Sequence, residues 1–72
     1  MSNAIHQRAS DKAFAKIETL NFRIQSDERN IATGSYGGIT YEEAVLVLEC
    51  NKTELKVWQH IAELIEKSNK NQ

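Results

Sequence analysis

The sequence predicts an all-α protein, and three observations lead to that prediction. The chain of 72 residues contains no Pro, and its three Gly all fall between positions 34 and 38. Residues that break helices are therefore confined to one place. On both sides of that place, apolar residues recur at intervals of three and four, as they do along one face of a helix. A chain of this length holds one domain at most, and we expect that domain over residues 10–67.

The predicted domain has little material for a core. At this size a chain buries only about 60% of its unfolded surface. Its single Cys cannot form an internal disulfide, and its two His and one Cys show no metal-ligand spacing. Small chains without such cross-links often gain stability by oligomerising. The sequence therefore predicts a homodimer or larger helical bundle.

The first predicted element is a long amphipathic helix over residues 10–31. Ser10 or Asp11 can cap its start. Phe22 lies on the face opposite the apolar stripe, where it is either simply exposed or part of a second contact surface. The spacing of the stripe also fits two heptads of a coiled coil, with Asp27 at the next position of the seam. The stripe consists of Ala9, Ala13, Phe14, Ile17, Leu20, Ile24 and Ile31.

The residues before this helix, 1–9, are expected to be flexible, and Ser2-Asn3-Ala4 is either a tag remnant or a native start. The segment that follows the helix, TGSYGG at residues 33–38, is expected to be a connector. Its glycines permit positive φ and end the helix. Its spacing fits neither the phosphate loop nor the dinucleotide-binding fingerprint.

A second, short helix is expected to begin after Thr40. Thr40 and Glu43 form the pattern of a capping box, in which each side chain bonds the other residue's backbone N–H. The apolar run AVLVL at residues 44–48 would also suit a short buried strand. The capping box favours the helix.

A tight turn at residues 49–51 and a third, longer helix complete the predicted fold. Asn51 and Glu54 form a second possible capping box. The helix would run to about Lys67 and leave a polar, disordered tail at 68–72. Trp58 would anchor the core or an interface. Val57 and Leu64 widen the apolar arc, so the surface left for a partner would consist of Phe22, Val57, Trp58 and Leu64.

No pattern in the sequence indicates catalysis. Cys50 and His60 lie ten residues apart on different predicted elements, without a third residue to orient them. Glu42 and Glu43 suit the first turn of a helix, where the dipole favours acids. We therefore expect a protein that is not an enzyme and has no cofactor or metal. No apolar run reaches the roughly 20 residues of a membrane span, and a lone Cys favours a reducing, cytoplasmic setting.

Residues 39–58 resemble the helix-turn-helix opening of excisionase-like and mercury-regulator-like DNA-binding proteins. The resemblance rests on ITYEEA at 39–44, Leu48, CNKTEL at 50–55 and Trp58. It implies that the third helix is a recognition helix whose N-terminal part reads the major groove. The residues that would face DNA are then Lys52, Thr53, Lys56, Gln59 and His60.

Two functions are consistent with the sequence. The first is a helical interaction module, such as an adaptor, inhibitor or assembly protein, that pairs with itself or with another protein. The second is a DNA-binding regulator of the helix-turn-helix kind, such as one from a phage or mobile element. The net charge of −1 favours the first, since DNA contacts require an excess of cations.

Overall fold

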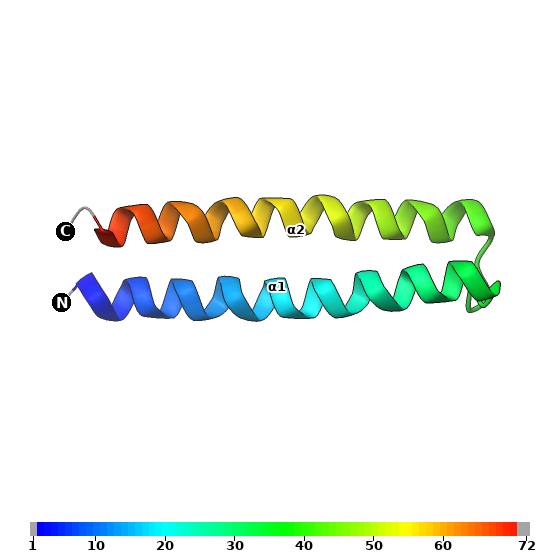
Figure 1. Ribbon diagram of the computed structural model, residues 1–72, viewed down its shortest axis with the longest axis horizontal. Coiled ribbons are helices and arrows are strands. Elements are labelled where there is room, and N and C mark those ends of the chain that lie inside the picture. Colours follow the sequence, from blue (N-terminus) through cyan, green and yellow to red (C-terminus); the bar gives the residue numbers. More distant parts are fainter. Residues whose placement is uncertain (1, 71–72) are drawn as a thin grey trace.

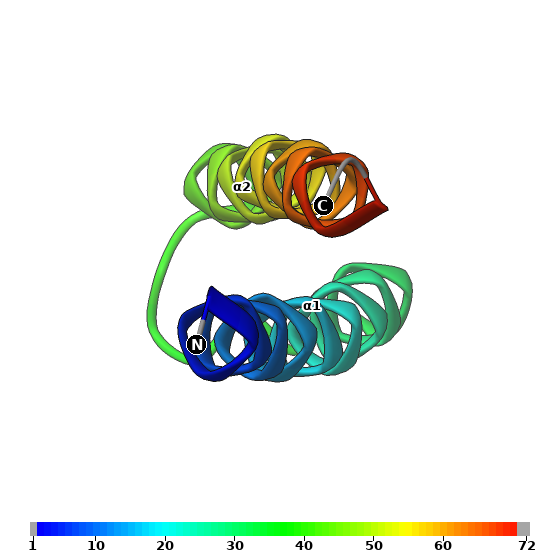
Figure 2. The same cartoon turned by 90° about the vertical axis from the view of Figure 1, so that its left-hand side faces the viewer.

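The computed structural model describes residues 2–70 and their side chains from 4 to 68. It contains two helices, α1 (Ser2–Thr33) and α2 (Tyr41–Lys70). They run side by side in opposite directions, so both ends of the chain lie at one end of the hairpin and the connecting loop lies at the other (Figure 1). Seen from the end with the termini, the helices form two layers that cross at a small angle (Figure 2). The prediction of an all-α protein is confirmed.

The hairpin is long and thin. Its principal extents are 50 × 14 × 14 Å and its radius of gyration is 15.9 Å, whereas a compact domain of this length has a radius of gyration of about 11 Å. The accessible surface is 5633 Å², against roughly 4,500 Å² for a compact protein of the same mass. The fold therefore leaves more surface in contact with solvent than a globular domain of this size would.

The predicted start of the first helix, at Ser10 or Asp11, is wrong. α1 begins at Ser2, so most of the segment expected to be flexible is helical. Residues 2–9 contain no breaker, and Ala, Gln and Arg favour helix. The Asp11 carboxylate does not cap the helix; it accepts a hydrogen bond of 2.9 Å from the Gln7 side chain. His6 Nε2 lies 3.1 Å from Ser68 Oγ of α2, which ties the open end of the hairpin.

The glycine segment is a connector, as predicted. Gly34, at φ 75°, ends α1, and the N–H groups of Gly34 and Ser35 donate to the carbonyls of Ile31 and Asn30 at 3.3 and 2.8 Å. This is the Schellman pattern of helix termination. Gly37 and Gly38, both at positive φ, then form a tight turn that Ile39 N–H closes onto the Tyr36 carbonyl at 3.3 Å. Only glycine takes this backbone without strain.

The capping box at the start of α2 is confirmed. The Thr40 backbone N–H donates to Glu43 Oε1 at 2.9 Å, and the Glu43 N–H donates to the Thr40 hydroxyl at 3.1 Å. The first helical bond, from the Ala44 N–H to the Thr40 carbonyl, follows at 2.9 Å. Residues 44–48 are accordingly helix and not strand.

The capping box makes the start of α2 sensitive to acid. The backbone and side-chain hydrogen bonds from Thr40 lower the pKa of Glu43 below its ordinary 4.5. Because the folded pKa is depressed, this contribution to stability is complete above the unfolded pKa and is lost as the pH falls below about 4.5. Glu43→Gln keeps the acceptor without the titration, so this variant should lose less stability than the wild type in that range. Thermal unfolding at a series of pH values measures the difference.

The matched control is Glu42→Gln, which removes the neighbouring first-turn carboxylate but leaves the bonds of Thr40 in place. This variant should keep the acid sensitivity of the wild type. Equal acid sensitivity of Glu43→Gln and the wild type would contradict the assignment.

The predicted turn at residues 49–51 is absent, because α2 is one continuous helix from Tyr41 to Lys70. No Gly or Pro interrupts this stretch, and the side chains expected to cap a third helix bond elsewhere. Asn51 Nδ2 donates to Asp27 Oδ2 at 2.8 Å, and the Thr53 hydroxyl donates to the Glu49 carbonyl at 2.9 Å. The third helix is thus the second half of α2. It passes the predicted end near Lys67, and of the predicted tail only residues 71–72 lie outside the described part.

The core is a single seam between the two helices. In α1 the covered residues follow heptad spacing, as do those of α2, which places one narrow row from each helix in the contact. Ala13 and Leu20 are 0% and 1% exposed, and Ala44 and Leu48 are also buried. The seam residues are Ala9, Ala13, Ile17, Leu20, Ile24, Asp27 and Ile31 of α1, and Ala44, Leu48, Asn51, Leu55, Trp58, Ala62 and Ile65 of α2.

Asp27 and Asn51 are the polar members of the seam, and the hydrogen bond between them is partly buried. The heptad pattern read from α1, including the seam position of Asp27, is therefore confirmed. Phe14, expected in the apolar stripe, is 63% exposed and lies outside the seam. Over residues 2–70, neither helix has an apolar stretch long enough to span a lipid bilayer.

Candidate functional site

A second row, apolar except for Glu54, runs along α2 beside the seam. We call it the second stripe: Val47, Cys50, Glu54, Val57, Ile61 and Leu64. Its members recur at intervals of three and four, which is again heptad spacing. Val57 and Leu64 are 52% and 51% exposed, and Cys50 is exposed with a free thiol. A helix with two adjacent rows of this kind presents one row beyond the contact that it makes within the hairpin.

The residues predicted as an interface do not all lie together. Val57 and Leu64 belong to the second stripe. Trp58 lies half-buried in the seam, and its Nε1–H donates to Glu54 Oε2 at 3.3 Å, which orients the indole toward the second stripe. Phe22 is 73% exposed, but it lies on the side of α1 that points away from α2. Phe22 therefore lies apart from the other three residues, and a partner contact of these four stays a prediction.

A row of cations runs along one flank of α1. We call it the basic row: Arg8, Lys12, Lys16 and Arg23. At 100° per residue their side chains project within about 80° of one another. Asp11 and Glu18, the acids of the same stretch, point about 100° away from the middle of the row. All four cations are exposed, so the flank is positively charged although the chain as a whole has a net charge of −1.

The second stripe and the basic row lie on the same face of the hairpin. A shallow groove between the helices is lined by Lys12, Lys16 and Arg23 from α1 and by Glu54 from α2. The floor of the groove includes Leu20, and the small side chains of Ala15 and Thr19 border it. This face, which we call the docking face, therefore combines an apolar row from one helix with a cationic row from the other.

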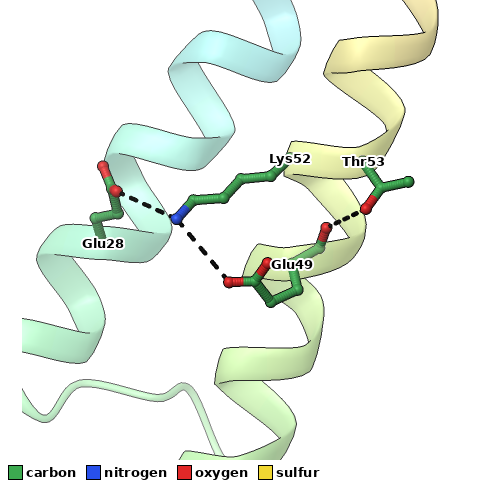
Figure 3. Close-up of polar contacts among 4 residues, drawn as sticks. All are labelled: Glu28, Glu49, Lys52 and Thr53. Atoms are coloured by element: carbon green, nitrogen blue, oxygen red, sulfur yellow. Dashed lines mark hydrogen bonds and ion pairs between the residues drawn. The ribbon is translucent and has the colours of Figure 1, made fainter.

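The residues predicted to face DNA lie elsewhere on α2. Lys52 crosses to α1 on the opposite face of the hairpin, where its Nζ lies 3.9 Å from Glu28 Oε2 and 4.0 Å from Glu49 Oε1 (Figure 3). Exposed pairs of this kind contribute about 0–1 kcal/mol each. They nevertheless place two carboxylates around the cation that would have to meet a phosphate or a base.

The other DNA-facing candidates are exposed but do not start a helix. Lys56, Gln59 and His60 are exposed along the middle of α2, and the Thr53 hydroxyl bonds back to the Glu49 carbonyl (Figure 3). A recognition helix places its N-terminal residues at the base edges, whereas these residues follow three turns of the same helix. The arrangement implied by the resemblance requires a turn that α2 does not have.

The structure does not bring the candidate catalytic residues together. Cys50 and His60 are on one helix, ten residues and therefore about 15 Å apart along its axis. Within the described residues, no group of three or more His, Cys, Asp and Glu side chains could hold a metal ion. The two exposed rows on the docking face are therefore the features with chemical consequence.

The sequence contained signals for both rows, although neither was predicted as a unit. The second stripe follows from the three-and-four spacing of residues 47–64, which the assumed turn at 49–51 interrupts. The basic row follows from the four-residue spacing of residues 8, 12 and 16, of which only Arg8 falls in the segment expected to be flexible. Comparison with protein-family models, with curated proteins and with solved structures finds no match to this chain.

Proposed function

We propose that this protein is a small, non-enzymatic helical interaction module that docks helices on its docking face. The observation that carries the proposal is the second stripe, an exposed apolar row with heptad spacing beside an already formed helix pair. Heptad rows pack by inserting each side chain between four residues of a facing helix. One helix laid along this face would extend the hairpin to a bundle of three helices, and a second hairpin would extend it to a bundle of four.

The surface area of the hairpin supports the proposal. Its accessible surface exceeds that of a compact protein of equal mass by roughly 1,100 Å². A standard protein interface covers about 800 Å² on each partner. Burying one face of the hairpin would therefore bring it close to the exposure of an ordinary globular domain.

The purified protein should self-associate weakly, because another copy is the only partner then present. Sedimentation equilibrium in reducing buffer should show reversible association at high micromolar concentration. Val57→Glu/Leu64→Glu should raise the dissociation constant by at least about tenfold, because it buries charges in an apolar contact. Both positions are half-exposed in the hairpin and Glu favours helix, so circular dichroism should show the fold unchanged.

The control is Phe22→Glu, which replaces a more exposed apolar residue on the far side of α1. It should leave the association constant within error of the wild type. Association that depends on Phe22 and not on Val57 and Leu64 would contradict the proposed docking face. A protein that stays monomeric at high micromolar concentration and also binds no helical peptide would contradict it as well.

DNA binding is the alternative proposal, and less supports it. The candidate residues surround Lys52, which already lies between two carboxylates. Titration of mixed duplex DNA at low salt tests it, with Lys52→Glu/Lys56→Glu as the variant. Binding that this double substitution abolishes would favour the regulator over the interaction module.

A further inference from the structure

We infer that the partner of the docking face is an amphipathic helix of another protein, with an apolar heptad stripe and an acidic flank. This inference rests on the proposed function and adds the chemistry of the partner. The partner helix would lie along the groove between α1 and α2. Its apolar stripe would pack on the second stripe, and its carboxylates would lie along the basic row.

The apolar half of the inference follows from the geometry of α2. The apolar members of the second stripe continue over about five helical turns, from Val47 to Leu64. Beside Glu54 the groove is lined on α1 by Ala15, Thr19 and Leu20. Small residues on α1 let a third backbone approach closely, so the side chains of a docked helix could enter the groove.

The acidic half follows from the charges of α1. Arg8, Lys12 and Lys16 are spaced four apart, which places like charges next to each other on the helix surface and destabilises it. The ion pairs of Lys52 with Glu28 and Glu49 lie on the opposite face of the hairpin, so these carboxylates do not offset the charge of the basic row. A flank of carboxylates on the docked helix would offset this repulsion and give the complex charge complementarity.

A second copy of the chain fits the docking face less well. In a two-fold pair stacked on this face, α1 lies over either the α1 or the α2 of the partner. The first arrangement sets the basic row against itself. The second arrangement places the basic row over the second stripe of the other copy. The carboxylate of that stripe, Glu54, already accepts a hydrogen bond from Trp58. Self-association is therefore confined to contact between α2 helices, and we expect it to be weaker than binding of the acidic helix.

An anionic lipid surface also fits less well. Glu54 lies in the middle of the second stripe, and immersing the stripe in hydrocarbon would bury this carboxylate away from water at a high cost. A docked helix covers the same row while its own polar flank and the cations that line the groove stay beside Glu54. The heptad spacing and the groove likewise correspond to a helix and not to a planar surface.

Two synthetic helical peptides of about four heptads, the length at which a heptad pattern becomes distinctive, test the inference. Both carry the same Leu/Ile stripe, and they differ only in Glu or Lys along one flank. Neither contains Trp, so the emission of Trp58, the only Trp of the chain, reports binding beside the second stripe. The Glu peptide should bind at least about tenfold more tightly than the Lys peptide, and its binding should weaken as salt is added.

Two charge-matched variants locate the contact. Lys12→Gln/Lys16→Gln/Arg23→Gln removes three cations from the docking face and should weaken binding of the Glu peptide about tenfold. The control substitutions Arg29→Gln, Lys56→Gln and Lys67→Gln remove three exposed cations that lie off this face and should leave binding unchanged. A scrambled peptide with the composition of the Glu peptide but no apolar stripe should not bind.

Equal binding of the Glu and Lys peptides, or equal loss in both triple variants, would overturn the inference while leaving the proposed function intact. Self-association tighter than binding of the Glu peptide would assign the face to a second copy. Tighter binding to phosphatidylglycerol vesicles or duplex DNA, lost in the docking-face triple variant, would overturn it in favour of lipid or nucleic acid. A protein that neither self-associates nor binds any peptide would contradict both proposals.

Discussion

Leu20→Ala is expected to lower the free energy of unfolding by about 2–5 kcal/mol, the range for truncating a buried Leu. Leu20 is the largest fully buried side chain and is 1% exposed. A native domain is stable by only about 5–15 kcal/mol in total, and small ones lie at the low end. The hairpin has a single narrow seam with no second core to compensate. Urea denaturation followed by circular dichroism should show a large loss of stability, or a chain that is unfolded without denaturant.

The control for this substitution is Phe22→Ala, two residues away on the same helix. It removes a larger side chain that is 73% exposed, so its effect should stay within about 0.5 kcal/mol. Equal effects of the two substitutions would mean that α1 presents a different face to α2 than the one described.

Asn51→Leu is expected to cost about 1–3 kcal/mol, because it leaves the Asp27 carboxylate partly buried without its partner. The double variant Asp27→Leu/Asn51→Leu removes both polar groups and completes an apolar seam. It should recover the lost stability and could exceed the wild type, as apolar replacements of buried polar pairs do. Denaturation of the wild type, both single variants and the double variant forms a cycle that measures the coupling.

The double substitution is expected to reduce the specificity with which the two helices align. A polar pair at one level of the seam fixes how the two helices align, because any shift by one turn leaves both groups unpaired. The double variant should therefore populate additional oligomers in sedimentation equilibrium although it unfolds at higher denaturant. A double variant as unstable as Asn51→Leu, or one with the association behaviour of the wild type, would contradict the assigned role of the pair.

Local chemistry made several elements predictable. The capping box of Thr40 and Glu43 requires only residues three apart, and it forms as predicted. The glycines mark the connector because three positive φ angles occur there. The seam of α1 follows from spacing alone, and Ala13 and Leu20 are its buried members.

The predicted second turn shows where local chemistry stops being decisive. Asn51 and Glu54 have the same capping pattern as Thr40 and Glu43, yet only the first pair caps a helix. Glycines at positive φ precede Thr40 and end the preceding helix, whereas Glu49 and Cys50 favour continuation. Asn51 also has an alternative partner in Asp27, 24 residues away. A pattern of four residues contains no information about that partner.

The same long-range partnership separates the docking face from the residues predicted to face DNA. With α2 continuous, residues 47–64 form one row and the basic row of α1 lies beside it across the groove. With a turn at 49–51, the row is divided and Lys52 becomes the first cation of a recognition helix. The DNA-facing set depended on that turn, and the docking face depends on its absence.

The sequence by itself determined the helical class, the position of the connector and most of the α1 residues of the seam, because these follow from propensity, backbone sterics and periodicity within a few turns. Only the tertiary structure decided that there are two helices instead of three, and which flanks share a face. Antiparallel packing pairs positions far apart in the chain, as with Asp27 and Asn51. The side of the hairpin on which a flank of one helix lies is then set by where the other helix packs, and not by the residues of that flank.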